Sequence, residues 1–193
     1  MTNGYAVVPA QTGLLPAITL VLGGARSGKS RHAEALVRTH ADAVGLQPVY
    51  IATAEAGDGE MAERIADHQA RRGACWQTEE APLALGDAIT AHANNGQPVL
   101  IDCLTLWLSN IMLAGLDIAA ETASLLDYLG NTPGPIVCVA NEVGLGIVPD
   151  TALGRAFRDH AGQLNQQLAA RADRVDFIAA GLPITLKTSS QTG

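Results

Sequence analysis

An eight-residue run near the start of the chain has the residue types and spacing that hold the phosphates of a nucleotide. Gly23–Ser30 reads GGARSGKS and fits the pattern G-x-x-x-x-G-K-[ST]. The glycines let successive backbone N–H groups point at phosphate oxygens, and a helix that begins near Lys29 adds the positive end of its dipole. In this pattern Lys29 contacts the β- and γ-phosphates and the Ser30 hydroxyl ligates Mg²⁺. The predicted nucleotide-binding residues of the loop are Gly23, Gly24, Ala25, Arg26, Ser27, Gly28, Lys29 and Ser30.

The alternative is a glycine-rich turn that arose by chance. An apolar strand pattern directly precedes the run and a helix pattern directly follows it, which favours the phosphate loop.

Two further polar residues follow apolar runs and are candidates for the same site. Asp102 ends the run Val99–Ile101, and we expect its carboxylate to hold Mg²⁺ partly through water. Alternatively, Asp102 ends a strand and caps the next helix. Thr53 follows Val49–Ala52, where its hydroxyl either touches a ribose or phosphate or simply terminates the strand.

A histidine in the charged segment Glu60–Arg72 is a candidate nucleophile. A helix over this segment places His68 on one face with Met61 and Ile65. Nearby arginines favour the neutral imidazole, which can attack phosphorus. The alternative for a lone histidine on a helix is a surface or capping residue. The arginines are Arg64, Arg71 and Arg72.

Two more polar pairs lie where strands end or helices begin. Glu79 and Glu80 either accept hydrogen bonds from a guanine edge or a ribose, or form a solvated pair that starts the next helix. Asn141 and Glu142 follow an apolar run and precede two glycines, so they are a possible substrate loop. The alternative there is a plain turn with a helix cap at Asp150.

Composition limits the class of protein. The chain has 193 residues, 48% hydrophobic and 16% charged, which is enough for one domain with its own core. A net charge of −7 argues against a surface that coats nucleic acid. Three scattered cysteines support neither a disulfide framework nor a zinc site. No apolar run approaches the ~18 residues of a membrane span, so we expect a soluble cytoplasmic protein.

Hydrophobic patterning predicts alternating strands and helices. The expected strands are Ile18–Leu22, Val49–Ala52, Val99–Ile101, Ile136–Ala140, Val175–Ala179 and Ile184–Leu186. The expected helices are Lys29–Thr39, Glu60–Arg72, Leu104–Leu113, Ala119–Leu129 and Thr151–Ala172. This order predicts an α/β fold, a mainly parallel sheet covered by helices on both faces, with its ligand site beyond the carboxyl ends of the strands. We expect a flexible leader over residues 1–16, the domain over 17–188 and a tail over 189–193.

These motifs, in this order, resemble the bifunctional adenosylcobinamide kinase / adenosylcobinamide-phosphate guanylyltransferase family of vitamin B12 biosynthesis. The resemblance spans about Ile18 to Lys187. The segments that carry it are GGARSGKSRHAEAL (Gly23–Leu36), VYIATAEAGDGEMAERIADHQARR (Val49–Arg72), LIDCLTLWLSN (Leu100–Asn110), NEVGLGIVP (Asn141–Pro149) and FRDHAGQLNQQLAARAD (Phe157–Asp173). The resemblance implies a P-loop NTPase fold of the RecA-like kind and a homotrimer.

The resemblance also implies an activity. Members phosphorylate adenosylcobinamide with ATP or GTP, then transfer GMP from GTP to that phosphate through a GMP–histidine intermediate. The products are adenosyl-GDP-cobinamide and pyrophosphate. Two other functions stay open from the phosphate loop alone: a different small-metabolite P-loop kinase, and a regulatory P-loop ATPase.

The family's functional residues map onto this chain by motif. The family's I-x-x-H-x-x-x-R pattern identifies His68 as the GMP-bearing histidine, with Arg72 at its last position. Some members have adjacent histidines, whereas this chain has Asp67 before His68, and a carboxylate there favours the charged imidazole. His32 is the other family-typical histidine, and its helix position suits packing better than attack. Residues implied to contact the nucleotide outside the loop are Thr53, Ala54, Glu55, Glu80 and Asp102.

Overall fold

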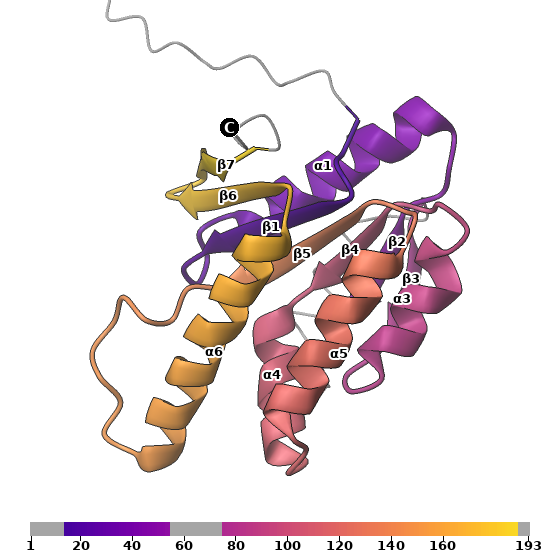
Figure 1. Ribbon diagram of the computed structural model, residues 1–193. Helices are drawn as coiled ribbons and strands as arrows, with labels where there is room; N and C mark the ends of the chain where they lie inside the picture. The colour runs from indigo at the N-terminus through magenta and orange to yellow at the C-terminus, as the bar shows by residue number, and fades with distance from the viewer. Residues whose placement is uncertain (1–13, 55–74, 189–193) are drawn as a thin grey trace, which may run out of the picture.

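The computed structural model describes residues 14–54 and 75–188, within which a seven-stranded sheet forms the centre of the molecule (Figure 1). The strand order is β3-β2-β4-β5-β1-β6-β7, and every neighbouring pair is parallel except β6–β7. The strands are β1 Ile18–Gly23, β2 Val49–Ala52, β3 Gln77–Glu80, β4 Val99–Asp102, β5 Ile136–Asn141, β6 Arg174–Ala179 and β7 Leu182–Lys187.

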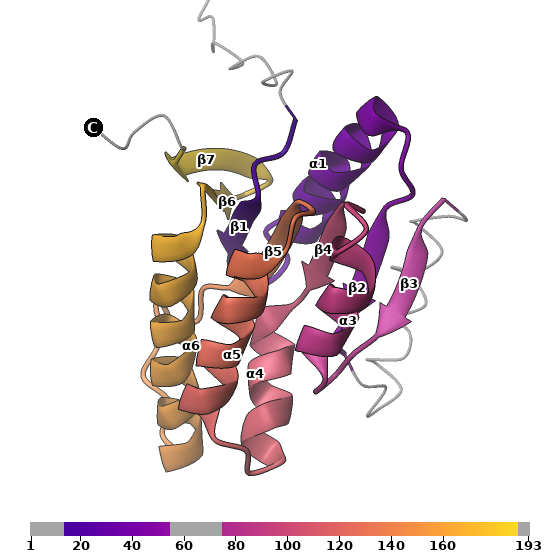
Figure 2. The same cartoon turned by 45° about the vertical axis from the view of Figure 1, so that its right-hand side comes forward.

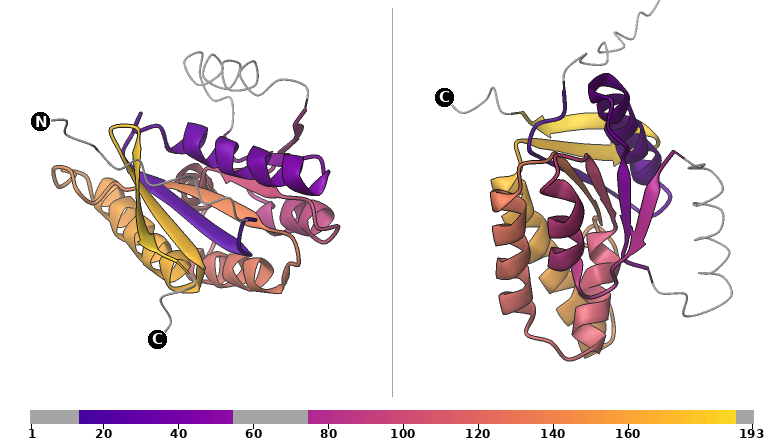
Figure 3. Two further views of the ribbon diagram at one scale, coloured as in Figure 1. Left: turned by 90° about the horizontal axis from the view of Figure 1, so that it is seen from above. Right: turned by 90° about the vertical axis from the view of Figure 1, so that its right-hand side faces the viewer.

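Helices cover both faces of this sheet (Figures 2 and 3). Of the described helices, α1 alone packs on one face, where its buried residues meet apolar side chains of the central strands. The other four described helices pack on the opposite face around the larger core cluster. The expected α/β class is confirmed. The helices are α1 Lys29–Val44, α3 Leu85–Ala93, α4 Leu104–Leu113, α5 Ile118–Asn131 and α6 Ala152–Arg171.

The central strands are almost entirely apolar because both of their sides are buried. In β5, Ile136, Cys138 and Ala140 face the four-helix side, while Val137 and Val139 face α1. All five are at most 1% exposed. A strand covered on both faces has little room for a polar residue, which explains the nearly continuous apolar runs in the sequence.

Most expected elements are confirmed, with differences at their ends. The strand Val49–Ala52 and the helix Leu104–Leu113 have the expected bounds. Helix α1 continues beyond the expected Thr39 to Val44, where Gly45 takes the left-handed conformation at φ 72° and ends it. The helix expected over Glu60–Arg72 lies outside the described residues.

The expectation that Glu79 and Glu80 start a helix is wrong. They form the end of the edge strand β3, and the next helix begins at Leu85. β3 pairs with β2 alone, and its residues are mostly exposed, so it carries no apolar pattern. Its strand conformation depends on backbone hydrogen bonds to β2 rather than on side-chain burial.

The structure describes only part of the two ends of the chain. Residues 1–13 and 189–193 lie outside the described part. Leu15, inside the expected leader, packs against the α1 side of the core, and its N–H donates to His40 Nδ1 at 2.9 Å. In the described ranges no helix is both long enough and apolar enough to cross a membrane.

Candidate nucleotide-binding site

The phosphate loop lies between β1 and α1, as its sequence predicts. β1 ends at Gly23 and α1 begins at Lys29. A Cβ on Gly23 would stand 2.7 Å from the carbonyl oxygen of Ile178, and Gly28 has a φ of 97°. Only glycine satisfies both requirements without strain, so these two positions give the loop its path.

The N-terminus of α1 has a positive electrostatic potential that favours an anion. Gly28 provides no side-chain cap, and the first turn contains no acidic residue. The first backbone N–H groups of the helix therefore keep their positive potential, which favours a phosphate group at this position.

Lys29 brings a full positive charge into the same loop. Its side chain is largely enclosed, with 9% of the residue exposed, and Nζ donates a hydrogen bond to the carbonyl oxygen of Gly24 at 3.2 Å. The ammonium group thus folds back over the loop instead of extending into solvent. Ser30, which follows it, is half-buried in the first turn of α1.

Asp102 lies at the end of β4, and β5 separates this strand from β1. The Tyr50 hydroxyl donates to Asp102 Oδ2 at 3.1 Å. Helix α4 begins after Cys103 with no side-chain cap from that residue, and the Asp102 carboxylate is oriented by Tyr50. The arrangement therefore differs from the helix-cap alternative.

The Cys103 thiol, which follows Asp102 in the chain, is affected by two opposite charges. Burial raises the pKa of Cys103 to about 11, the negative charge of Asp102 raises it as well, and the positive charge of Lys29 lowers it. Asp102 ends β4 and Lys29 begins the helix that follows β1, so both residues lie at the carboxyl edge of the parallel strands. A hydroxyl at Ser30 and a carboxylate at Asp102 are the hard oxygen ligands that Mg²⁺ prefers.

Thr53 is fully buried, and its hydroxyl is used within the protein. Oγ1 donates to the carbonyl oxygen of Cys103 at 2.7 Å and accepts from the Cys103 N–H at 2.8 Å. The carbonyl oxygen of Thr53 accepts from Asn110 Nδ2 at 2.8 Å. These hydrogen bonds connect the end of β2 to the start of α4. The role of Thr53 in the structure therefore corresponds to the strand-terminating alternative.

The strand register brings two acidic residues, Glu80 and Asp102, to the same level at the carboxyl edge of the sheet. Ala52 pairs with Glu80 on one side and with Asp102 on the other. Glu80 is exposed, and the half-buried Ala54 lies two residues beyond Ala52. The structure therefore places Glu80 and Asp102 on either side of the end of β2. Glu55 and His68 lie outside the described residues.

The residues that follow β5 contact the base of the phosphate loop. Asn141 is paired in register with Gly23, and the Glu142 N–H donates to the Gly23 carbonyl oxygen at 3.1 Å. Glu142 Oε1 accepts from the Gly144 N–H. Within the described part of the chain the buried Asn141 Oδ1 has no hydrogen-bond partner, so it is an available acceptor beside the loop. Figure 1 shows this segment leaving β5 beside the loop and crossing to α6.

Sequence reasoning did not single out Tyr50, because it sits within an apolar strand run. It also overlooked Asp176, a fully buried carboxylate in β6 that contacts His32 of α1. A charged residue inside the apolar run Val175–Ala179 was the available signal.

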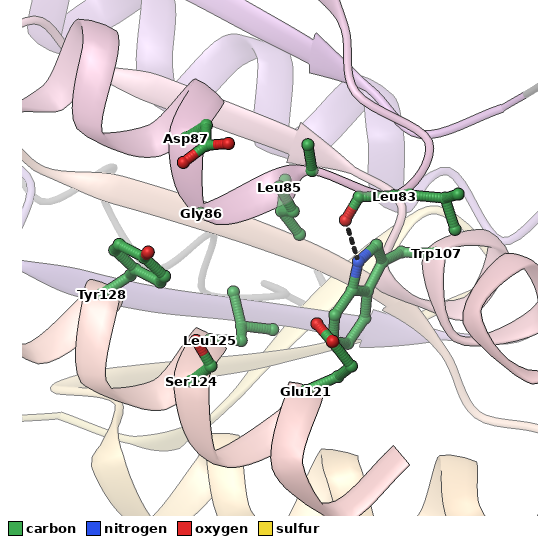
Figure 4. Close-up of a pocket in the computed structure, with 10 residues that line it drawn as sticks. Leu83, Leu85, Gly86, Asp87, Trp107, Glu121, Ser124, Leu125 and Tyr128 are labelled. Atoms are coloured by element: carbon green, nitrogen blue, oxygen red, sulfur yellow. Dashed lines mark hydrogen bonds between the residues drawn. The ribbon is translucent and has the colours of Figure 1, made fainter. Parts of the chain in front are cut away.

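A cavity of about 160 Å³ lies elsewhere, between α3, α4 and α5 on the four-helix face (Figure 4). Trp107 forms part of its wall, and its Nε1 donates to the Leu83 carbonyl oxygen at 3.2 Å. None of the predicted site residues lines this cavity.

The sheet, the phosphate loop and the uncapped start of α1 define a P-loop nucleotide-binding protein of the α/β class. The chain belongs to the cobinamide kinase / cobinamide phosphate guanyltransferase family, whose model matches residues 19–186. The expected family, and with it the class of bifunctional kinase and guanylyltransferase, is confirmed.

Two relatives agree with this membership, and one solved structure shares the fold. "Bifunctional adenosylcobalamin biosynthesis protein CobP" of Pseudomonas aeruginosa is 52% identical over 172 residues, covering 87% of this chain and 96% of the relative. "Bifunctional adenosylcobalamin biosynthesis protein CobU" of Escherichia coli is 42% identical over 183 residues, covering 87% and 98%. The flagellar accessory protein FlaH of Methanocaldococcus jannaschii shares the fold at a TM-score of 0.53 and 11% identity, covering 91% of this chain and 80% of FlaH.

Proposed function

We propose that this chain phosphorylates adenosylcobinamide with ATP or GTP and then transfers GMP from GTP to the resulting phosphate. The products of the second step are adenosyl-GDP-cobinamide and pyrophosphate. The observation that carries the proposal is the phosphate loop, with Lys29 Nζ folded over it at 3.2 Å from Gly24, in a member of this family.

In the kinase step, the loop N–H groups and the start of α1 hold the triphosphate, and Lys29 neutralises charge that develops on the transferred phosphoryl group. Ser30 and Asp102 would hold Mg²⁺, which supplies charge neutralisation between the phosphates when it is bound. Asn141 and Glu142, which lie next to Gly23, are our candidates to contact the accepting hydroxyl.

In the guanylyltransferase step, His68 attacks the α-phosphorus of GTP and pyrophosphate leaves. Adenosylcobinamide phosphate then takes the GMP from the histidine. Support for His68 comes from the family motif and from the neighbouring Arg64, Arg71 and Arg72, which suit a site where phosphate charge develops. Glu80, at the end of β3, is our candidate to bind the guanine or ribose.

The central experiment incubates the protein with labelled GTP and Mg²⁺, with and without adenosylcobinamide, and analyses both products and protein. Lys29→Ala removes a contact typically worth ~3 kcal/mol or more in the transition state, so both reactions should slow by orders of magnitude. Lys187→Ala is the matched control: it removes the other lysine of the chain, which contacts the carbonyl oxygens of Ala169 and Ala170 in α6. A wild-type rate in Lys29→Ala for either reaction contradicts the proposed nucleotide site.

The same labelling experiment separates the two proposed activities. His68→Ala should abolish the covalent GMP and guanylyl transfer and leave the kinase largely intact, because phosphoryl transfer to a hydroxyl needs no covalent enzyme intermediate. The adduct should be labile in acid and stable in base, as a phosphoramidate is. An adduct on His32, or full labelling of the His68→Ala variant, contradicts the assignment. Without any adduct, the chain would be a metabolite kinase or a regulatory ATPase.

Asp102→Asn tests the magnesium role. We expect nucleotide binding to weaken more in the presence of Mg²⁺ than in its absence. An equal loss under both conditions would make Asp102 a structural residue. Homotrimer assembly and a cytoplasmic location stay predictions from the resemblance and the sequence, and light scattering of the purified protein tests the first.

A further inference from the structure

A fully buried carboxylate links helix α1 to the hairpin formed by β6 and β7. Asp176, on β6, is 0% exposed. Its Oδ2 accepts from His32 Nε2 at 2.9 Å and from Arg174 Nη2 at 2.8 Å, and its Oδ1 accepts from Thr185 Oγ1 at 2.9 Å. Three donors from α1, β6 and β7 therefore converge on one carboxylate, and none of the four residues has a role in the proposed chemistry.

The turn of the same hairpin touches the phosphate loop. The Gly181 N–H donates to the Ser27 carbonyl oxygen at 2.9 Å. Ala180 and Gly181 have φ values of 51° and 81°, as a two-residue hairpin turn requires. A Cβ on Gly28 would stand 3.4 Å from the Gly181 Cα, so the two backbones lie in contact.

The other end of the connection is also close to the loop. His32 lies within the first turn after Lys29, and its backbone N–H donates to the Gly28 carbonyl oxygen at 3.0 Å. Asp176 thus holds the helix that starts at the loop and also, through Thr185 and Arg174, the hairpin whose turn supports the loop from its outer side.

From this geometry we infer that Asp176 is a positioning residue for the phosphate loop, acting through His32 on one side and the β6–β7 turn on the other. The inference rests on the proposed function, since it assumes that the loop binds a nucleotide. The carboxylate touches no nucleotide itself. It keeps the loop N–H groups and the start of α1 in the relative positions that bind phosphates, so its loss should raise the Kd for phosphate-bearing ligands.

The test measures Kd by displacing a fluorescent GTP analogue with GTP and with tripolyphosphate. His32→Ala removes the donor from α1 and leaves Asp176 paired with Arg174 and Thr185. We expect Kd to rise roughly tenfold, which corresponds to about 1.4 kcal/mol. The factor should be similar for both competitors, because the loop binds phosphates and not the base. His40→Ala is the matched control: it removes an imidazole from the same helix whose partner is the Leu15 N–H.

A second pair of variants keeps the test decisive if His32→Ala folds poorly. Thr185→Val removes the hydroxyl with little change in shape, and Thr185→Ser retains it. We expect the valine variant to raise Kd roughly three- to fivefold and the serine variant to stay within about twofold of wild type. Binding stoichiometry should stay at the wild-type value, whereas partial unfolding would lower stoichiometry and leave Kd unchanged.

The outcomes separate this inference from the proposed function. If Lys29→Ala weakens GTP binding but His32→Ala and Thr185→Val bind as tightly as their controls, Asp176 has no positioning role and the nucleotide site stands. A changed stoichiometry at constant Kd also overturns the inference. If Lys29→Ala binds GTP like the wild type, the proposed function itself fails.

Discussion

Replacement of Thr53 by valine separates two roles for a residue that the sequence leaves ambiguous. The hydroxyl of Thr53 is fully buried, donates to the Cys103 carbonyl oxygen at 2.7 Å and accepts from the Cys103 N–H at 2.8 Å. Valine retains the branched shape and loses both hydrogen bonds. We therefore expect Thr53→Val to reduce the stability of the fold, with nucleotide affinity affected much less.

The size of the loss follows from which partner is left unsatisfied. The Cys103 carbonyl oxygen also accepts from the N–H groups of Leu106 and Trp107, at 3.1 and 3.2 Å, so it keeps partners in the variant. The buried Cys103 N–H has Thr53 Oγ1 as its acceptor, and an orphaned buried donor costs about 1–3 kcal/mol. Adding a net value of about 1 kcal/mol for the second bond gives about 2–4 kcal/mol in all. At roughly 2–4 °C per kcal/mol for a domain of this size, Tm should fall by about 4–16 °C.

Urea unfolding at constant m-value and nucleotide titration together measure both effects. Thr53→Ser is the control, because it keeps the hydroxyl and loses one methyl group, at a cost of about 1 kcal/mol. If the valine variant is as stable as the serine variant, the reasoning about Cys103 is refuted. If it unfolds like the serine variant and also loses nucleotide affinity, the hydroxyl contacts the ligand.

Three other predictions address stability and reactivity. Burial raises the pKa of Asp176, but hydrogen bonds from its partners and the positive charge of Arg174 outweigh this effect and hold the pKa below its usual value. The stabilising contribution of Asp176 is therefore complete above the unfolded-state pKa of ~4 and is lost as pH falls through the folded-state pKa. The urea midpoint of the wild type should drop in acid, and the Asp176→Asn variant should show a smaller drop. Burial raises the pKa of Cys103 to about 11 and that of Cys138 to about 12, whereas Cys75 is exposed. An alkylating reagent at neutral pH should therefore modify Cys75 in the folded protein and the other two cysteines only after unfolding. Peptide mass spectrometry measures this difference. A methyl group on Gly162, within α6, would meet no described atom within 4 Å apart from its chain neighbours and the backbone of its own helix. Alanine there should therefore stabilise the protein by about 0.5–1 kcal/mol in the same urea assay, and a destabilised variant would contradict this.

Local patterns were sufficient for the central part of the fold. The strands β1, β4 and β5 are buried on both faces, so their sequences are almost entirely apolar and can be recognised without tertiary information. The phosphate loop is mostly local, because Gly28 and Lys29 act within one short segment whose spacing carries its geometry. The close approach that requires Gly23 is not local, since it involves the carbonyl oxygen of Ile178.

Features that depend on residues far apart in the chain could not be predicted from the sequence. β3 is a strand because its backbone pairs with β2, which its polar residues cannot indicate. Asp102 and Tyr50 are 52 residues apart in the chain, and strand register alone brings that hydroxyl to that carboxylate.

The sequence by itself determined the α/β class, the phosphate loop and the family, because each is encoded in short-range periodicity or in contiguous motifs. Only the tertiary structure decided that the Thr53 hydroxyl bonds to Cys103, and that Asp176 joins His32 across 144 residues of chain. The physical reason is that a buried polar group takes whichever partner folding brings within hydrogen-bond distance, and no local pattern records that choice.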